Sequence, residues 1–463
     1  MVTVKNNTGI NCVLVIGLGR IGLPQALTFA ESGITVYGFD RNENNIAALK
    51  KGISPFYEPS MDSYLKNTLD EKFFPFAAWV DIEKHFLAVD AIVFTIGTSA
   101  PVEQDIILKK QIDFTEYFKL IDQLFFKKNS FKKGVKLIIR TTMPLGGTDQ
   151  LKKYIETKFL INEGTDFFLA FVPERITEGA AIKELKTLPK IIGVYSDAAF
   201  LPISKLFEYI GSSVLRVKNP ITAEFCKLTD NTFRSTLFGY ANEIAMHASE
   251  FDINVEEVIA TVNDHYGRNH IPSPGFVSGY CLSKDPYIFE LGFSKNKDQR
   301  DFQSVWFYAR KTNDYLMEFV VKKVLQKIGD AKNCIIAILG LSFKEDVDDF
   351  RLSHSLKIMD LLIKSGVKKL NCYDPFLNKN KYTVIPEAFN PYVLIKSSTL
   401  NDDFFIDVDA IIICDRDEVL CDFNDSKKIE KLLKNTKKPC VVYDAWDIWN
   451  ECTHLKNIHY EHL

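Results

Sequence analysis

The sequence lacks the features that mark a membrane, secreted or nucleic-acid-binding protein. No apolar run reaches the roughly 20 residues needed to span a bilayer, and MVTVKNNTGIN lacks the basic-then-apolar layout of a secretory signal. The formal net charge of −3 provides no basic field for a phosphate backbone. We therefore expect a cytoplasmic protein without a membrane segment or a nucleic-acid partner.

Cysteine is present without the spacing of a metal site. The nine cysteines form no CxxC pair and no Cys/His cluster, and their odd number leaves at least one unpaired in any disulfide scheme. Cys12 and Cys414 stand in strand-like runs, where cysteine acts as a small buried hydrophobe. Only Cys281 stands among glycines and charges, which favours a reactive thiolate. We expect no metal site.

Length and composition predict a compact protein with more than one core. At 463 residues the chain is longer than one hydrophobic core usually serves, so we expect two or three domains. Hydrophobic residues make up 46% and charged residues 25%, as in ordinary globular proteins.

The strand and helix patterns predict two α/β domains. Residues 12–40 read as a buried strand, a glycine turn, a helix and a second strand, and further strand-like runs alternate with helical patterns at 91–97, 135–142, 166–173 and 190–195. Strands disappear between 201 and 328, which favours a helical middle segment. Strand runs restart with NCIIAILGLSF and continue in KLNCYDP, DAIIICD and PCVVYDAW. We predict two Rossmann-like parallel-sheet domains, about 1–200 and 329–463, joined by helices at 201–328.

A dinucleotide fingerprint follows the first strand. Gly17, Gly19 and Gly22 form G-x-G-x-x-G, which suits a tight turn, a close approach to a pyrophosphate and close helix packing. Asp40 ends the next strand, where a carboxylate accepts hydrogen bonds from a ribose diol, although Arg41 weakens the discrimination against NADP. Glycine trios also occur in ordinary turns, but strand, turn, helix and acid agree here, so we predict NAD binding.

A second group of residues surrounds Cys281. If a helical turn begins there, Lys284 and Asp285 return to the same face and bring an ammonium and a carboxylate toward the thiol. Lys227 and Asn231 are spaced i, i+4 on a predicted helix. Taken alone, the segment around Cys281 is typical of a structural turn, and the pair Lys227 and Asn231 is typical of a solvated helix face.

The segment FVPERITEG adds Glu174 and Glu178 directly after a strand. Active sites of α/β folds lie at the carboxyl ends of strands, so the position of this pair indicates the same site.

Together these segments resemble the UDP-glucose/UDP-mannosaminuronate dehydrogenase family nearly end to end. The matching motifs, in order, are VIGLGRIGLPQALTFAESGITVYGFD, GISPFYEP, TTMPLGGT, PERITEG, KLTDNTFR leading to Asn242-Glu243, GYCLSKDP, GLSFKEDVDDFR and YDP. The resemblance implies NAD-dependent, four-electron oxidation of the C6 alcohol of a UDP-sugar to a uronic acid, for polysaccharide or glycan precursors. It also implies a homodimer, with an NAD-binding domain at 1–200, a dimerising segment with the cysteine loop at 201–328 and a UDP-sugar-binding domain at 329–463.

The resemblance assigns roles residue by residue. Cys281 is the nucleophile that forms a thiohemiacetal and then a thioester, Lys227 and Asn231 stabilise the oxyanion, and the remaining catalytic residues, which hold or activate water or act as acid and base, are Asp285, Thr142 and Glu178. The cofactor-binding residues are Gly17, Gly19, Arg20, Ile21, Gly22, Asp40, Arg41, Thr98 and Thr142. The substrate-binding residues are Glu174, Lys227, Asn231, Arg268, Gly279, Lys344 and Arg351, with Arg268 reaching across the dimer interface.

The chain departs from the family pattern at several positions. The cysteine loop carries Phe276 and Tyr280 where the family has more glycine, and TIGTSAP replaces the usual V-P-T-P. His354 replaces a common proline, and Arg140 stands where an acid is frequent. The residues that the chemistry requires remain, so we expect an active, divergent member.

Two other interpretations stay open at this point. A two-electron dehydrogenase of the 6-phosphogluconate or 3-hydroxyacid type shares the first domain, but it needs no cysteine and lacks the second α/β domain. A catalytically silent protein that binds NAD and a UDP-sugar predicts binding without turnover. The three interpretations differ in the NADH they predict: two per product for the four-electron dehydrogenase, one for the two-electron dehydrogenase and none for the silent binding protein.

Overall fold

The computed structural model describes residues 9–97, 112–126, 131–293 and 302–463. The chain divides into two compact units, Met1–Asp230 with Leu291–Lys297 and Asn231–Glu290 with Asp298–Leu463. The division falls within one long helix, α10 (Pro220–Glu250).

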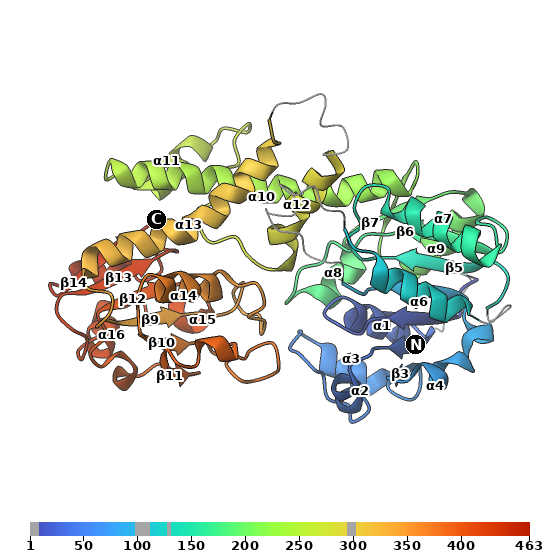
Figure 1. Ribbon diagram of the computed structural model, residues 1–463, viewed down its shortest axis with the longest axis horizontal. Helices are drawn as coiled ribbons and strands as arrows, with labels where there is room; N and C mark the ends of the chain where they lie inside the picture. The colour runs from blue at the N-terminus through green and yellow to red at the C-terminus, as the bar shows by residue number, and fades with distance from the viewer. Residues whose placement is uncertain (1–8, 98–111, 127–130, 294–301) are drawn as a thin grey trace. The chain divides into compact units, whose positions relative to one another are not determined.

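In the first unit, eight strands of the described residues form one sheet in the order β3-β2-β1-β4-β5-β6-β7-β8 (blue to green in Figure 1). Neighbours run parallel except β6 and β7, which are antiparallel. The strands are β1 (Cys12–Ile16), β2 (Thr35–Phe39), β3 (Phe73–Phe76), β4 (Ala91–Phe94), β5 (Val135–Ile139), β6 (Phe167–Phe171), β7 (Lys190–Val194) and β8 (Val214–Val217). The α-helices are α1 (Gly22–Glu31), α2 (Glu43–Leu49), α3 (Met61–Thr68), α4 (Trp79–Glu83), α6 (Thr115–Phe125), α7 (Gly147–Phe159), α8 (Ala181–Thr187) and α9 (Asp197–Tyr209).

Side chains of β1 alternate between two cores, because successive residues of a strand point to opposite faces. Val13 and Val15 pack in a cluster that includes residues of α1, α3 and α9. Leu14 and Ile16 pack in a second cluster with residues of α6 and α7. Both faces of the sheet are therefore covered, and its carboxyl edge stays available for loops at the switch point between β1 and β4.

Two edge strands of this sheet differ from the sequence prediction. β3 contains Pro75, which the expected runs do not include; an edge strand accommodates proline because one side of it makes no ladder bonds. β8 lies within 201–328, so the expectation that strands are absent there is wrong. Its sequence VLRV is short and half-exposed, and it therefore carries little apolar signal.

In the second unit, the described residues form a parallel sheet in the order β11-β10-β9-β12-β13-β14 (orange to red in Figure 1). The strands are β9 (Ile335–Leu339), β10 (Lys369–Tyr373), β11 (Val393–Ser397), β12 (Ala410–Ile413), β13 (Cys440–Asp444) and β14 (Ile458–His462). Its helices are α14 (His354–Lys364), α15 (Glu418–Cys421) and α16 (Ser426–Leu432). Ile336 and Ile338 pack with residues of α14 and the middle helices, whereas Ala337 and Leu339 pack with residues of α16.

The middle segment is helical, as expected. After α10 follow α11 (Val255–Asn263), α12 (Tyr280–Phe293) and α13 (Val305–Ile328). Two parallel-sheet α/β domains with a helical middle segment confirm the predicted fold class. None of the helices found in the described ranges is both long and apolar enough to cross a membrane.

Candidate active site

The glycine turn has the geometry of a dinucleotide site. Gly17 has a φ of +93°, which glycine adopts without strain. A Cβ on Gly22 would lie 1.7 Å from the carbonyl oxygen of Gly17, whereas a Cβ on Gly19 would meet nothing within 4 Å. The turn is therefore closed on its helix side and open at Gly19, where a pyrophosphate fits beside the N-terminus of α1. Arg20 and Ile21 complete the turn.

Asp40 follows β2 and braces this turn. Its Oδ2 accepts from the backbone N–H of Leu18 at 2.8 Å, and its Oδ1 accepts from that of Asn42 at 2.8 Å. Each carboxylate oxygen can accept a second bond, so a ribose hydroxyl fits the same group. Arg41 is exposed and pairs with Glu116 at 3.4 Å.

We expect the substitution Asp40→Ala to weaken NAD binding about 10- to 100-fold, because a hydrogen bond to a charged group contributes about 1.5–3 kcal/mol. Discrimination against NADP should also fall, since the carboxylate that repels a 2′-phosphate is gone. Titration calorimetry with NAD and NADP measures both effects without turnover. Glu43→Ala is the control, because Glu43 is an exposed acid nearby in the first turn of α2. An unchanged NAD affinity for Asp40→Ala would refute the ribose role.

Glu178 forms an ion pair inside the first unit. Its Oε2 lies 3.3 Å from Nε of Arg20, and the Arg20 guanidinium stacks over the ring of Phe56. The neighbouring Glu58 accepts from the backbone N–H of Gly179 at 2.9 Å. The segments GISPFYEP and PERITEG are thus joined beside the glycine turn.

Glu174 is buried and surrounded by cations. It forms an ion pair with Arg140, lies 3.7 Å from Nζ of Lys190 and accepts from the backbone N–H of Arg175 at 2.8 Å. Burial lowers the pKa of Arg140 to about 9 and that of Lys190, which also faces Arg140 and Arg175, to about 7. In this structure the carboxylate of Glu174 braces the chain after β6, and its role toward substrate stays a prediction.

Thr142 lies three residues after the end of β5 and is buried. The loop after it is fixed by Glu224 of α10, which accepts from the backbone N–H of Gly146 at 2.6 Å and of Thr148 at 2.7 Å. Burial raises the pKa of Glu224 to about 7. Glu224 was not predicted from the sequence, because an acid in the first turns of a long amphipathic helix gives little signal.

Cys281 lies in the first turn of α12 and is exposed. Lys284 and Asp285 follow at i+3 and i+4, so the predicted helical turn is confirmed. Nζ of Lys284 donates to Oδ1 of Asp285 at 2.6 Å, and both side chains are buried. Asn231 of α10, fully buried, donates through Nδ2 to the other oxygen of Asp285.

The charges of this cluster act on one another. Burial acts to lower the pKa of Lys284, but Asp285 and the Cys281 sulfur outweigh it, and the net pKa is raised. Lys284 therefore stays protonated and electrostatically coupled to the sulfur. Lys227 lies one turn before Asn231 on α10 and is also buried, so the bland interpretation as a solvated helix face does not hold.

The loop before Cys281 is held by residues that sequence reasoning did not select. Buried Arg310 of α13 donates to the carbonyl oxygens of Val277 at 3.1 Å and Leu282 at 3.3 Å. Asn242 of α10 bonds both the N–H and the carbonyl of Gly275, at 2.8 and 3.0 Å. Arg310 stands on the apolar stripe of α13, and a cation in such a stripe is the signal that was available.

The loop after β9 carries the predicted sugar-nucleotide residues. Lys344 is half-buried there, and Nε of Arg351 donates to Oδ1 of Asp349 at 2.9 Å. The Arg351 guanidinium lies 5.6 Å from the ring centre of Tyr280, the neighbour of Cys281. Asp374 after β10 accepts from two backbone N–H groups of this loop at 2.8 and 2.9 Å, much as Asp40 braces the glycine turn.

The remaining predicted binding residues are Gly279, Arg268 and Thr98. Gly279 has a φ of +82°, and a Cβ there would lie 2.4 Å from the ring of Phe343. Arg268 is exposed and stacks on Tyr266. Thr98 lies outside the described residues. Among the residues that are described, no group of three or more His, Cys, Asp or Glu side chains is arranged to hold a metal ion.

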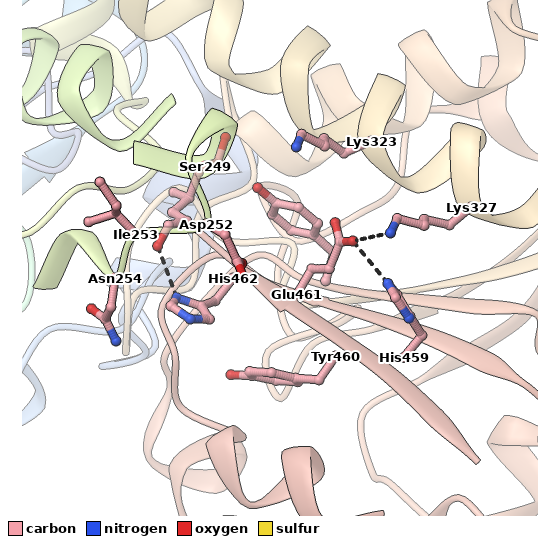
Figure 2. A pocket seen from close by; sticks show the side chains of 12 residues that line it. Ser249, Asp252, Ile253, Asn254, Lys323, Lys327, His459, Tyr460, Glu461 and His462 are labelled. Atoms are coloured by element: carbon pink, nitrogen blue, oxygen red, sulfur yellow. Dashed lines mark hydrogen bonds and ion pairs between the residues drawn. The ribbon is translucent and has the colours of Figure 1, made fainter. Parts of the chain in front are cut away.

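A cavity of about 430 Å³ opens elsewhere in the second unit, between the end of α10, α13 and β14 (Figure 2). Glu461 points between Lys327 and His459 in it, and its Oε1 lies 2.8 Å from Nζ of Lys327 and 3.0 Å from Nε2 of His459. None of the predicted catalytic or binding residues lines this cavity. Its charges largely neutralise one another, and we assign it no ligand.

The dinucleotide turn, the thiol coupled to a buried lysine and the second nucleotide-type α/β domain define a cysteine-containing, dinucleotide-dependent dehydrogenase. Comparison with known proteins makes the class specific. The UDP-glucose/GDP-mannose dehydrogenase family matches through its NAD binding domain at residues 11–211, its central domain at 221–315 and its UDP binding domain at 337–451. The chain belongs to this family, and its cofactor is NAD.

Individual relatives agree over most of the chain. The UDP-N-acetyl-D-mannosamine dehydrogenase of Pyrococcus horikoshii is 33% identical over 370 residues, 79% of this chain and 84% of the relative. The NDP-N-acetyl-D-galactosaminuronic acid dehydrogenase of Ralstonia solanacearum is 26% identical over 95% of this chain and 96% of the relative. A solved structure of UDP-D-ManNAc dehydrogenase from Pyrococcus horikoshii superposes with a TM-score of 0.78 at 28% identity, over 94% of this chain and 96% of that one.

Family membership decides between the earlier interpretations. Residues 337–451 match a UDP binding domain, and the 6-phosphogluconate or 3-hydroxyacid type has no such domain. The protein is thus an NAD-dependent oxidoreductase of the nucleotide-sugar dehydrogenase family. The alternative of a catalytically silent binding protein predicts that NAD and a UDP-sugar bind without formation of NADH.

Proposed function

We propose that the protein oxidises the C6 alcohol of a UDP-sugar to a carboxylate, with Cys281 as the covalent nucleophile. The observation that carries the proposal is the cluster of Cys281, Lys284, Asp285 and Asn231 on α12 and α10. The thiolate is the nucleophilic form of cysteine, and the protonated Lys284 supplies a positive charge that interacts with the sulfur.

The residues take distinct parts in the proposed reaction. NAD, when bound, supplies the hydride acceptor for the two oxidation steps, from the C6 alcohol to the aldehyde and from the thiohemiacetal to the thioester. The Cys281 thiolate adds to the C6 aldehyde and forms a thiohemiacetal, whose oxidation gives a thioester; water then adds to the acyl carbon, and the thiolate leaves as the acid forms. Lys227 and Asn231 stabilise the oxyanion, an effect that is typically worth about 10²–10³ in rate per donor.

Asp285, Thr142 and Glu178 are proposed to hold the water and to move its proton. Asp285 accepts from both Lys284 and Asn231, so its carboxyl group has a fixed orientation. Glu178 is held beside the glycine turn by its ion pair with Arg20.

The sugar is proposed to be an N-acetylated hexosamine. This choice rests on the names of the relatives above, which are dehydrogenases of UDP-N-acetyl-D-mannosamine and of an NDP-N-acetyl-D-galactosaminuronic acid. Lys344 and Arg351 are proposed to hold the UDP-sugar, and Arg268 to reach it from a partner subunit. For the homodimer we propose α10, on which Phe233 and Tyr240 are exposed seven residues apart, on one side of the helix.

We expect two NADH per molecule of UDP-uronic acid formed. The assay combines NADH absorbance with mass spectrometry of the product, for UDP-glucose, UDP-N-acetylglucosamine, UDP-N-acetylmannosamine and UDP-N-acetylgalactosamine. An N-acetylated substrate should give the highest kcat/KM. One NADH per product would contradict the thioester route, and NAD and UDP-sugar binding without NADH would support a silent binding protein.

A further inference from the structure

The loop before Cys281 is attached to the second α/β sheet by its own polar groups. The backbone N–H of Gly279 donates to the carbonyl oxygen of Leu352 at 3.2 Å. The hydroxyl of Ser278 lies 3.1 Å from the carbonyl oxygen of Phe343 and also contacts a histidine. These contacts fix Ser278 and Gly279, which lie three and two residues before the proposed nucleophile.

The histidine is His354, the first residue of α14, and its ring is buried. Nε2 lies 2.6 Å from the carbonyl oxygen of Cys414 at the end of β12, and Nδ1 lies 2.8 Å from Oγ of Ser278. A carbonyl oxygen only accepts, so Nε2 carries the proton and Nδ1 of the neutral ring is an acceptor. The single hydroxyl hydrogen of Ser278 is then shared between Nδ1 of His354 at 2.8 Å and the carbonyl oxygen of Phe343 at 3.1 Å. Burial lowers the pKa of His354 to about 4, which keeps the ring neutral near pH 7.

Apolar contacts hold the same ring in place. Phe276 stacks on His354 with ring centres 4.7 Å apart and an interplanar angle of 18°. Trp446 packs edge-on against Phe276 and donates through Nε1 to the same Cys414 carbonyl at 2.9 Å. The Cys414 carbonyl oxygen thus accepts from both His354 and Trp446, and these two rings, which pack against Phe276, attach the loop to the end of β12.

We infer that His354 is a positioning residue for Cys281: its neutral ring, held between the Cys414 carbonyl and the Ser278 hydroxyl, sets the position of the cysteine loop. The inference rests on the proposed function of Cys281. Ser278 is three residues from Cys281, so a shift of this contact moves the start of α12 and with it the sulfur. A misplacement of about 1 Å can cost about 10²-fold in rate.

The test uses Ser278→Ala, which removes the hydroxyl and keeps the ring, its bond to Cys414 and its stack with Phe276. We expect kcat for NADH formation to fall about 10- to 100-fold, while KM for the UDP-sugar changes less than about twofold. His354→Gln should act in the same way, and the double variant should be no slower than the slower single variant, because both substitutions remove the Ser278–His354 contact. Ser278→Ala also removes the contact with the Phe343 carbonyl, which His354→Gln keeps. Ser273→Ala is the matched control, since that hydroxyl contacts Glu256 instead.

Two readouts work without turnover. Amide hydrogen exchange of residues 275–280 should quicken in Ser278→Ala and stay unchanged in Ser273→Ala. The rate of Cys281 alkylation by iodoacetamide, followed by mass spectrometry, should change at least about threefold in Ser278→Ala, as expected for a thiol in an altered setting.

The outcomes are distinct. Unchanged kcat, exchange and alkylation in Ser278→Ala would overturn the positioning role, and so would faster exchange with unchanged kcat. If the wild-type enzyme forms no NADH, the proposed function fails, and the exchange and alkylation rates alone decide the positioning role. If His354→Gln does not fold, Ser278→Ala carries the test.

Discussion

Replacement of Cys281 by serine is expected to abolish uronic acid formation, with a loss of roughly 10⁴-fold or more in rate, as when other covalent nucleophiles are removed. A serine hydroxyl is a much weaker acid than a thiol, and the neighbouring Lys284 is protonated and bonded to Asp285, so we expect the hydroxyl not to be activated as a nucleophile. The oxidation would therefore stop at the aldehyde. Mass spectrometry of the sugar nucleotides after incubation with NAD measures the loss.

Cys421 provides the matched control. Of the nine cysteines, all of which lie in the described residues, Cys281 and Cys421 are the two that are exposed. Cys421 belongs to α15 on the second sheet domain, and the sequence predicts no role for it. Cys421→Ser should keep full activity and Cys281→Ser should not. Equal acid formation by both variants would eliminate the covalent mechanism.

The parts of the fold that could be predicted are those with strong local signals. Central strands such as β1 and β12 are continuous apolar runs because both faces are covered, and the sequence marks them clearly. The glycine turn was predictable because each glycine has a separate steric reason. The Cys281–Asp285 turn was predictable because helical spacing alone brings i, i+3 and i+4 together.

The unpredicted parts depend on contacts that are distant in sequence. β11 and β14 are edge strands whose residues are half-exposed, so their apolar signal is diluted. The partners of Glu174 come from the ends of two other strands, and no spacing rule joins Arg140 or Lys190 to it. His354 looks like a departure from the family pattern in sequence, whereas the structure shows it bonded to the cysteine loop.

The substitution Asp285→Asn is expected to lower both activity and stability. Lys284 and Asp285 are buried together, and loss of one member leaves an uncompensated charge, which typically costs about 3–5 kcal/mol. Asp360→Asn is the control, because Asp360 pairs with Lys364 on the surface of α14, where such a pair contributes about 0–1 kcal/mol. Urea denaturation of both variants gives the free energies of unfolding. A loss for Asp285→Asn no larger than that of the control would contradict the importance of the buried pair.

The pH dependence of this loss has a defined sign. In the wild-type protein Asp285, Cys281 and Tyr280 raise the pKa of Lys284 against the effect of burial. Without Asp285 we expect burial to have the larger effect, so that the pKa of Lys284 falls below its value in the unfolded chain. The unfolded variant then binds more protons than the folded one, so the stability of the variant rises with pH. The difference in unfolding free energy between wild type and Asp285→Asn should therefore shrink from pH 7 to pH 9.5. A difference that is constant or grows over this range would show that Lys284 does not carry the uncompensated charge.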